Sequence, residues 1–224
     1  MNNKKTNYDN IKRIVCFGDS NTWGYNPENG TRYPSSIRWT GVLQQMLGDE
    51  YLIIEEGQNG RTIANPDPAE WGTKSGIEYV IPMIESHMPM DMLIIMLGTN
   101  DLKAKFNYPA PDIAGCLQNL LLKVKGHLNY HLGHPDLKIL IISPPQIGED
   151  IAASPFFPFV DADSIINVSK ELPKWYKMVA DQFECDFLDA TSLVSGGKID
   201  SLHLSEESHK VLAEAVYKKV VKLE

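Results

Sequence analysis

The sequence predicts an α/β fold built on a five-stranded parallel sheet. Five apolar runs have the length of strands, and several are continuous rather than alternating, as expected for strands covered on both faces. Segments with helical periodicity separate these runs, and this alternation implies parallel strands joined by right-handed crossovers. The chain of 224 residues suits one large α/β domain, so we expect residues 1–224 to form a single unit.

The expected strands and helices alternate along the chain. The strands cover residues 11–17, 51–55, 92–97, 137–142 and 185–188. The helices cover residues 36–47, 76–87, 113–130, 164–183 and 205–223. The last helix has the clearest start, because Ser205 can cap its N-terminus. Residues 143–163 are rich in proline and phenylalanine, and we predict there a long loop with a function or an oligomer contact.

Charge and hydropathy exclude several classes of function. The formal net charge is −8, with 43% hydrophobic and 22% charged residues. An acidic chain is poorly suited to phosphate backbones, so nucleic acid is not expected as a partner. No apolar run approaches the roughly 20 residues of a membrane-spanning helix, and the first residues lack the apolar segment of a secretory signal. We therefore expect a cytoplasmic protein with no membrane partner.

Cysteine and histidine spacing does not predict a metal centre. The three cysteines are widely separated and form neither a disulfide framework nor a CxxC motif. His127, His131 and His134 have a suggestive spacing, but they lie near the amino end of the fourth expected strand. Ligands in open parallel sheets bind at the other edge. We expect no metal and no cofactor.

The carboxyl end of the first expected strand carries a candidate nucleophile. The strand ends in Gly18-Asp19-Ser20-Asn21, a glycine-flanked polar turn that presents the Ser20 hydroxyl at the sheet edge. A serine becomes a good nucleophile only when a base removes its proton. Taken alone, the turn is equally compatible with Asp19 and Ser20 capping the next segment.

The far end of the chain supplies a matching base. Asp200-Ser201-Leu202-His203 follows the last expected strand and precedes the last helix, so it also lies at the carboxyl edge. With two residues between them, a carboxylate can fold onto Nδ1 of the imidazole and leave Nε2 to face a hydroxyl. An isolated pair of this spacing is more often a surface loop with an incidental histidine, so the assignment depends on further segments.

Two other strand-ending turns contain candidate hydrogen-bond donors. The segment EEGQNGRT after the second strand contains Gly60, and the segment MLGTND after the third contains Asn100. A glycine lets a backbone N–H approach a reacting carbonyl, and an asparagine side chain adds another donor. Together with the N–H of Ser20 they would form an oxyanion hole. The alternatives are a tight turn for Gly60 and a helix cap for Asn100.

Two other protein classes begin with a similar strand and loop. In a phosphotransfer enzyme of the haloacid-dehalogenase type, Asp19 would be the nucleophile. However, Asn21 replaces the second aspartate of that class, and no clear acidic pair for magnesium follows a later strand. In a flavodoxin-like module the loop would hold a flavin phosphate, but Trp23 and Tyr25 crowd it. Neither class explains the carboxylate–imidazole pair near the end of the chain.

Four blocks together resemble those of the SGNH/GDSL hydrolase superfamily. Ser20 stands in GDS, Gly60 in the second segment, Asn100 in GTND and His203 in DxxH, in the superfamily's order and across nearly the whole chain. The longer strings FGDSNTWG, EEGQNGRT and IIMLGTND, with the Ser-Pro-Pro at residues 143–145, are similar to the mycobacterial arylesterase/acyltransferase (perhydrolase) branch. The resemblance implies a three-layer α/β/α sandwich on a five-stranded parallel sheet, with a flavodoxin-like arrangement.

Carried over by position, the resemblance also implies roles for individual residues. Ser20 is the nucleophile, and His203 is the general base, oriented by Asp200. The oxyanion hole consists of the backbone N–H groups of Ser20 and Gly60 and the side chain of Asn100.

Three neighbouring residues are candidates for the substrate pocket. Trp23 either walls the acyl pocket or packs under its own loop. Asn21 replaces a leucine common in many GDSL strings and changes the polarity expected of the acyl pocket. Arg61 either lines the entrance or pairs with Glu55 or Glu56.

We therefore expect a serine esterase for short-chain acyl esters of aryl or alkyl alcohols, with an acyl-enzyme intermediate and acyl transfer to alcohols or peroxide. The alternative is a carbohydrate O-acetylesterase, because specificity depends on pocket walls that one sequence does not place. The expected partner is a small-molecule ester. We also expect a homo-oligomer, with residues 156–159 as a candidate apolar contact.

Overall fold

Five parallel strands form one sheet whose carboxyl ends share an edge. The structure, a computed structural model, describes residues 11–156 and 161–223. The strands are β1 (Lys12–Gly18), β2 (Tyr51–Gly57), β3 (Met92–Met96), β4 (Lys138–Ile142) and β5 (Asp186–Leu188). Their order in the sheet is β2-β1-β3-β4-β5, and every pairing is parallel.

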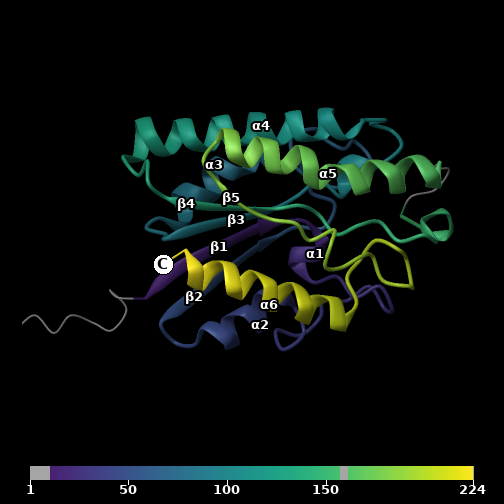
Figure 1. Ribbon diagram of the computed structural model, residues 1–224, viewed down its shortest axis with the longest axis horizontal. Helices are drawn as coiled ribbons and strands as arrows, with labels where there is room; N and C mark the ends of the chain where they lie inside the picture. Colours follow the sequence, from purple (N-terminus) through teal and green to yellow (C-terminus); the bar gives the residue numbers. More distant parts are fainter. Residues whose placement is uncertain (1–10, 157–160, 224) are drawn as a thin grey trace, which may run out of the picture.

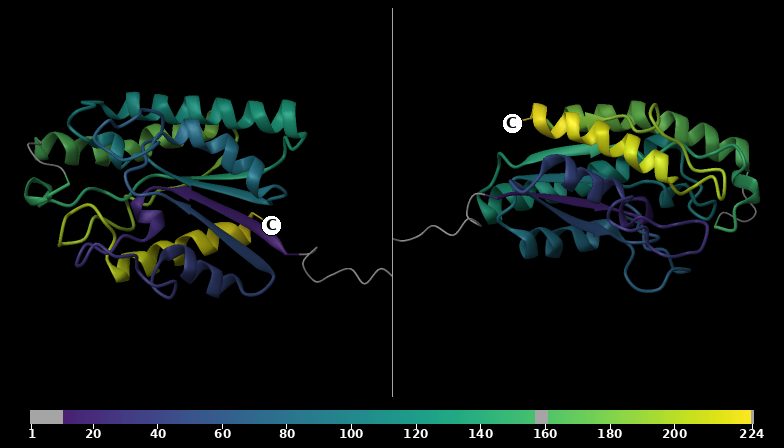
Figure 2. Two further views of the ribbon diagram at one scale, coloured as in Figure 1. Left: turned by 180° about the vertical axis from the view of Figure 1, so that it is seen from behind. Right: turned by 90° about the horizontal axis from the view of Figure 1, so that it is seen from below.

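Helices cover both faces of this sheet. The α-helices are α1 (Ser20–Trp23), α2 (Trp39–Leu47), α3 (Gly76–His87), α4 (Ala110–His127), α5 (Ala162–Gln182) and α6 (Glu206–Lys222). The other short helices are the 3-10 helices η2 (Asn100–Leu102) and η4 (Ile151–Ala153) and the π-helix η3 (Leu128–Leu132). Figure 1 shows α3, α4 and α5 on one side of the strands and α2 and α6 on the other. The reverse view in Figure 2 shows the same three layers.

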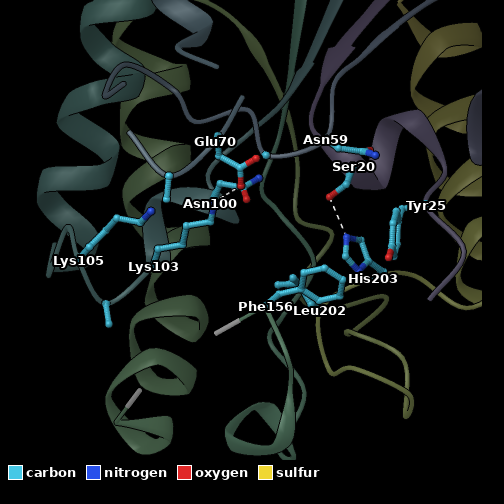
Figure 3. A pocket seen from close by; sticks show the side chains of 13 residues that line it. Ser20, Tyr25, Asn59, Glu70, Asn100, Lys103, Lys105, Phe156, Leu202 and His203 are labelled. Carbon is cyan, nitrogen blue, oxygen red and sulfur yellow. Dashed lines mark hydrogen bonds and ion pairs between the residues drawn. The ribbon is translucent and has the colours of Figure 1, made fainter. Parts of the chain in front are cut away.

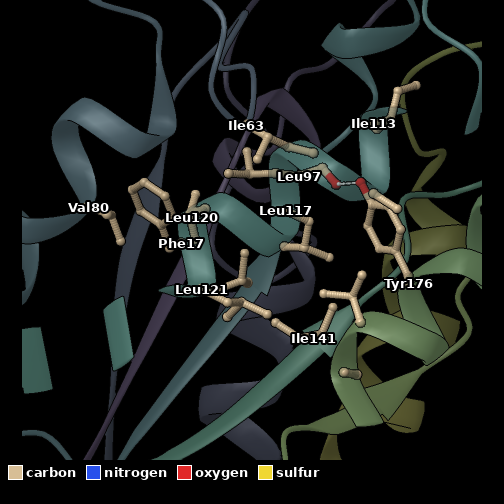
Figure 4. Close-up of a cluster of buried hydrophobic side chains, with 14 of the residues drawn as sticks. Phe17, Ile63, Val80, Leu97, Ile113, Leu117, Leu120, Leu121, Ile141 and Tyr176 are labelled. Carbon is tan, nitrogen blue, oxygen red and sulfur yellow. Dashed lines mark hydrogen bonds between the residues drawn. The ribbon is translucent and has the colours of Figure 1, made fainter. Parts of the chain in front are cut away.

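Alternate residues of the central strands contribute to two separate apolar cores. On β1, Val15 and Phe17 belong to the core under α3, α4 and α5, whereas Ile14 and Cys16 belong to the core under α2 and α6. Figure 4 shows part of the first core. Because both faces of the strand are buried, its sequence is a continuous apolar run instead of an alternating one.

The point where the chain changes direction across the sheet determines where a ligand can bind. From β1 the chain crosses to β2 on one side, and it then returns to β3 on the other side of β1. Such a switch in strand order leaves a crevice outside the carboxyl ends of the two neighbouring strands. Ser20 directly follows β1 and Asn100 follows β3, so both lie at this crevice.

The observed elements confirm the predicted α/β fold with a five-stranded parallel sheet. The expected loop at 143–163 contains η4, and residues 157–159 of the proposed apolar contact lie outside the described residues. The polar turn after β1 forms the short helix α1, which the sequence analysis did not predict. No helix in the described part of the chain is long and apolar enough to cross a bilayer.

The hydroxyl of Tyr176 connects α5 to the end of β3, and we predict that it contributes to stability. The side chain is fully buried, and its hydroxyl donates to the backbone oxygen of Leu97 at 2.9 Å. Tyr176→Phe leaves that buried oxygen without its donor. We expect a loss of about 1–2 kcal/mol in the free energy of unfolding, measured by urea denaturation.

Tyr130→Phe is the matched control for this change, because Tyr130 is 87% exposed. It should leave the free energy of unfolding within about 0.5 kcal/mol of the wild type. Equal effects of the two substitutions would show that the buried hydrogen bond contributes no net stability.

Candidate active site

The turn between β1 and α1 places Ser20 at the sheet edge. The side chain of Asp19 accepts a hydrogen bond from the N–H of Asn21 at 2.9 Å and so caps α1. Gly18 allows the helix to follow the strand directly, because a Cβ there would lie 2.1 Å from Oγ1 of Thr22 and 2.9 Å from the oxygen of Met96. Ser20 is consequently held in a tight turn with only 5% of its surface exposed.

The loop before α6 folds Asp200 back onto His203. Oδ1 of Asp200 accepts the N–H groups of Leu202 and His203 at 3.0 and 2.9 Å. Oδ2 lies 2.6 Å from Nδ1 of His203, so this nitrogen carries the proton and Nε2 is left as the acceptor. Burial alone would raise the pKa of Asp200, but its hydrogen bonds and the neighbouring imidazole outweigh burial and lower it.

The two segments meet through a direct contact between Ser20 and His203. Nε2 of His203 lies 2.9 Å from Oγ of Ser20, and Figure 3 shows the two side chains pointing toward each other. Asn21 holds the segments at this distance: its Oδ1 accepts the N–H of Leu204 at 2.9 Å, and its Nδ2 donates to the oxygen of Leu202 at 3.4 Å. The hydroxyl, imidazole and carboxylate therefore form a continuous hydrogen-bonded chain.

Gly60 and Asn100 line the same cavity as Ser20. Asn100 is 6% exposed, and its Nδ2 donates to the oxygen of Arg61 at 3.1 Å. An amide nitrogen carries two protons, so this bond fixes the side chain and leaves one proton for a ligand. Gly60 has a φ of +80°, a conformation that glycine adopts without strain.

The cavity has a volume of about 530 Å³ and two chemically different ends. One end is aromatic: the ring of Tyr25 lies 4.3 Å from that of His203, and the ring of Phe156 lies 5.3 Å from it on another side. The other end is charged and contains Glu70, Lys103 and Lys105. Figure 3 shows the two groups on opposite sides of the cavity, with Ser20 near the aromatic end.

The charged end consists of a chain of ion pairs. Nζ of Lys103 contacts both Oδ2 of Asp67 at 2.9 Å and Oε1 of Glu70 at 2.7 Å, and Lys105 also pairs with Asp67. Burial would raise the pKa of Asp67, but its hydrogen bonds from the two lysines outweigh this and lower the pKa to about 2. The ammonium groups are thus held by carboxylates of the protein itself.

The cavity lining does not include Asn21, Trp23 or Arg61, the three candidate pocket residues, and a role for them in the substrate pocket stays a prediction. Asn21 bonds the loop that carries His203. Trp23 lies against a guanidinium, with Cζ of Arg32 at 5.5 Å from its ring. Arg61 is 2% exposed, and its guanidinium donates to the oxygen of Gly18 at 2.8 Å and to that of Glu56. All three side chains thus have hydrogen-bond or ring partners in the structure around the cavity.

The sequence analysis did not assign Tyr25 or Glu70 to the cavity walls, and it gave Phe156 only as part of a loop with a function or an oligomer contact. Tyr25, Glu70 and Phe156 belong to three separate connecting segments, none of which carries a motif. One local signal points to Tyr25: the preceding Gly24 ends α1 in the left-handed conformation, with φ of +85°. That turn redirects the chain and brings the next side chain over the imidazole.

Two further carboxyl groups near Ser20, those of Asp19 and Asp101, are buried. Asp101 accepts the N–H of Ile63 with both oxygens, at 3.2 and 3.0 Å, and so joins the turn after β3 to the segment after Gly60. Burial, with a smaller effect of Asp19, raises the pKa of Asp101 to about 7. Burial also raises the pKa of Asp19.

Comparisons with known proteins agree on the family. Residues 16–211 match the GDSL-like Lipase/Acylhydrolase family. The native aryl esterase of M. smegmatis is 35% identical, with a TM-score of 0.84, over 96% of this chain and 100% of that one. Est24, a carbohydrate acetylesterase from Sinorhizobium meliloti, is also 35% identical, with a TM-score of 0.83, over 95% of this chain and 100% of that one. A search of the curated proteins found no match.

The family match covers most of the chain and includes the segments that carry Ser20, Gly60, Asn100 and His203. Two solved structures of esterases are similar over nearly the full length of both chains. The chain therefore belongs to the GDSL-like lipase/acylhydrolase family and is a carboxylic ester hydrolase.

Proposed function

We propose that the protein is a serine esterase that hydrolyses short-chain aryl or alkyl esters through an acyl-enzyme on Ser20. The observation that carries this proposal is the hydrogen-bonded chain from Ser20 through His203 to Asp200, which opens into the 530 Å³ cavity. A cavity of this size admits a small ester with an aromatic alcohol.

In the proposed reaction, Oγ of Ser20 attacks the ester carbonyl while Nε2 of His203 takes its proton. Asp200 keeps the imidazole in the required tautomer and stabilises the imidazolium that forms. His203 then gives the proton to the departing alcohol, and water, deprotonated by the same nitrogen, releases the acid. Ser20, the nucleophile, is restored at the end of the cycle.

The negative charge on the carbonyl oxygen needs donors that are already in position. We assign them to the N–H groups of Ser20 and Gly60 and to Nδ2 of Asn100. Ser20 is the first residue of α1, and the first N–H groups of a helix have no partner within it. The bond from Asn100 to the oxygen of Arg61 orients its amide before the substrate arrives.

A carbohydrate O-acetylesterase is the second candidate function, favoured by the similarity to the S. meliloti acetylesterase and by the polar side chains of Asn59 and Glu70 in the lining. We place aryl and alkyl esters first because Tyr25 and Phe156 surround the imidazole. An aromatic alcohol can pack against these rings as it leaves.

Ser20→Ala is expected to abolish turnover of p-nitrophenyl acetate. Without Oγ the acyl-enzyme cannot form, and only the acceleration of about 10³–10⁴ over water given by oxyanion stabilisation and binding remains. Steady-state kinetics on the folded variant measure this loss. The exposed Ser36 gives the control Ser36→Ala, which should keep wild-type rates. Near-wild-type turnover by a folded Ser20→Ala protein would refute the proposed nucleophile.

Asn100→Ala is expected to lower kcat by about 10²–10³ with little change in KM, because its amide acts mainly on the charge of the transition state. The two constants for p-nitrophenyl acetate are measured separately. Asn119→Ala, at an exposed position of α4, is the control. A change confined to KM would instead make Asn100 a residue for ground-state binding.

We expect the acyl-enzyme to transfer its acyl group to primary alcohols as well as to water. Phe156, Leu202 and Tyr25 line the cavity beside His203, and such apolar walls favour an alcohol over water as the acceptor. With a short-chain ester and rising alcohol, the ratio of new ester to free acid, measured by gas chromatography, should exceed the molar ratio of alcohol to water. A product ratio that only follows the molar ratio would contradict preferential transfer.

A further inference from the structure

The position of the imidazole requires the alcohol half and the acyl half of an ester to lie in different parts of the cavity. During the reaction the ester carbon carries four groups: Oγ of Ser20, the oxyanion, the departing oxygen and the acyl carbon chain. The departing oxygen must face Nε2 of His203 to receive its proton, and the oxyanion must face Gly60 and Asn100. The alcohol half therefore lies toward Tyr25 and Phe156, and the acyl chain extends the other way.

The direction left for the acyl chain ends at the charged side of the cavity. Glu70, Lys103 and Lys105, which belong to the cavity lining, lie there. Figure 3 shows Glu70 and the two lysines on the side away from Tyr25 and His203. An acyl chain longer than a few carbons would clash with these side chains.

The carboxylate of Glu70 fills the space directly beside the proposed oxyanion hole. A Cβ built on Gly60 would lie 2.6 Å from both Cδ and Oε2 of Glu70. The carboxylate is held there by Lys103, whose ammonium also contacts Asp67. The side chain of Lys103 is only 12% exposed. A longer acyl chain in this position would overlap with the carboxylate that Lys103 holds in place.

Building on the proposed function, we propose that Glu70, held by Lys103, is the residue that limits the length of the acyl group. Phe156 instead contacts the alcohol half of the ester. The substrate class is then an ester of a short acid, acetate or a close homologue, with an aromatic or other apolar alcohol. Glu70 acts as a wall: the space it occupies, more than its charge, sets the limit.

The test compares specificity ratios, so that effects common to two substrates cancel. The acyl ratio is kcat/KM for p-nitrophenyl hexanoate divided by that for p-nitrophenyl acetate. Glu70→Ala removes the wall and should raise this ratio about tenfold or more. Glu70→Gln is the matched control: it keeps the size of the side chain and should keep the ratio close to that of the wild type. Glu70→Ser is a second truncation and should behave like Glu70→Ala.

These variants are expected to fold, because Glu70 lies in a connecting segment with its side chain 31% exposed. Lys103 also keeps Asp67 as a partner when the carboxylate of Glu70 is removed. Circular dichroism and the urea midpoint verify the fold of each variant before kinetics.

A second ratio tests the orientation of the substrate. The alcohol ratio is kcat/KM for phenyl acetate divided by that for ethyl acetate. Phe156→Ala should lower the alcohol ratio several-fold and leave the acyl ratio near the wild-type value, whereas Glu70→Ala should do the reverse. Opposite assignments of the two effects would overturn the orientation.

The outcomes separate this inference from the proposed function. If the wild type hydrolyses the acetate but folded Glu70→Ala and Glu70→Ser keep its acyl ratio, the role of Glu70 is wrong and the esterase remains. An equal rise of the acyl ratio in Glu70→Gln would show that the charge of Glu70 sets the limit, and this would also overturn its role as a steric wall. If the wild type hydrolyses none of the esters, the proposed function fails and this inference fails with it.

Discussion

The contact between the Ser20 hydroxyl and the His203 imidazole is the interaction on which the site depends. The two residues are 183 positions apart in the sequence, so no local structure can hold them 2.9 Å from each other. The parallel sheet brings the two segments to one edge, and Asn21 fixes their separation through its bonds to Leu202 and Leu204. A residue next to the candidate nucleophile thereby aligns the candidate base, and the carboxamide is suited to this because it donates and accepts at once.

The strands were predictable because their sequence pattern follows from burial on both faces, as on β1. The helix ends were less predictable, since contacts distant in sequence determine them. Residue 36 was the expected start of a helix, but α2 begins at Trp39. The residue before it, Arg38, instead reaches Glu55 at the end of β2 and the oxygen of Tyr33. In the other direction, α4 begins at Ala110 with Pro111 in its first turn, where the fixed φ of proline suits a helix and its missing N–H would have no partner.

The sequence could place the motif residues at the site, but it could place the residues of the cavity walls much less well. Ser20, Gly60, Asn100 and His203 follow strand ends or adjoin the last helix, so the topology alone brings them to one edge. The walls depend instead on how connecting segments pack. Trp23 illustrates the difference: it lies close to Ser20 in sequence, yet its backbone packs against β2, where a Cβ on Gly57 would meet its nitrogen at 2.2 Å. The catalytic roles of the motif residues, the single domain and the homo-oligomer stay predictions.

The surroundings of three aspartates explain how negative charge can be concentrated where the proposed reaction needs it. Burial raises the pKa of Asp19 and of Asp101, which favours their neutral forms. The pKa of Asp200 is lowered despite burial, because the imidazole of His203 and two backbone N–H groups hydrogen-bond to its charged form. The charged form is therefore favoured at Asp200, against the ring that would become positive in the proposed reaction. The same fold thus lowers the pKa of one carboxyl group and raises that of two others, because their hydrogen-bond donors, neighbouring charges and access to water differ.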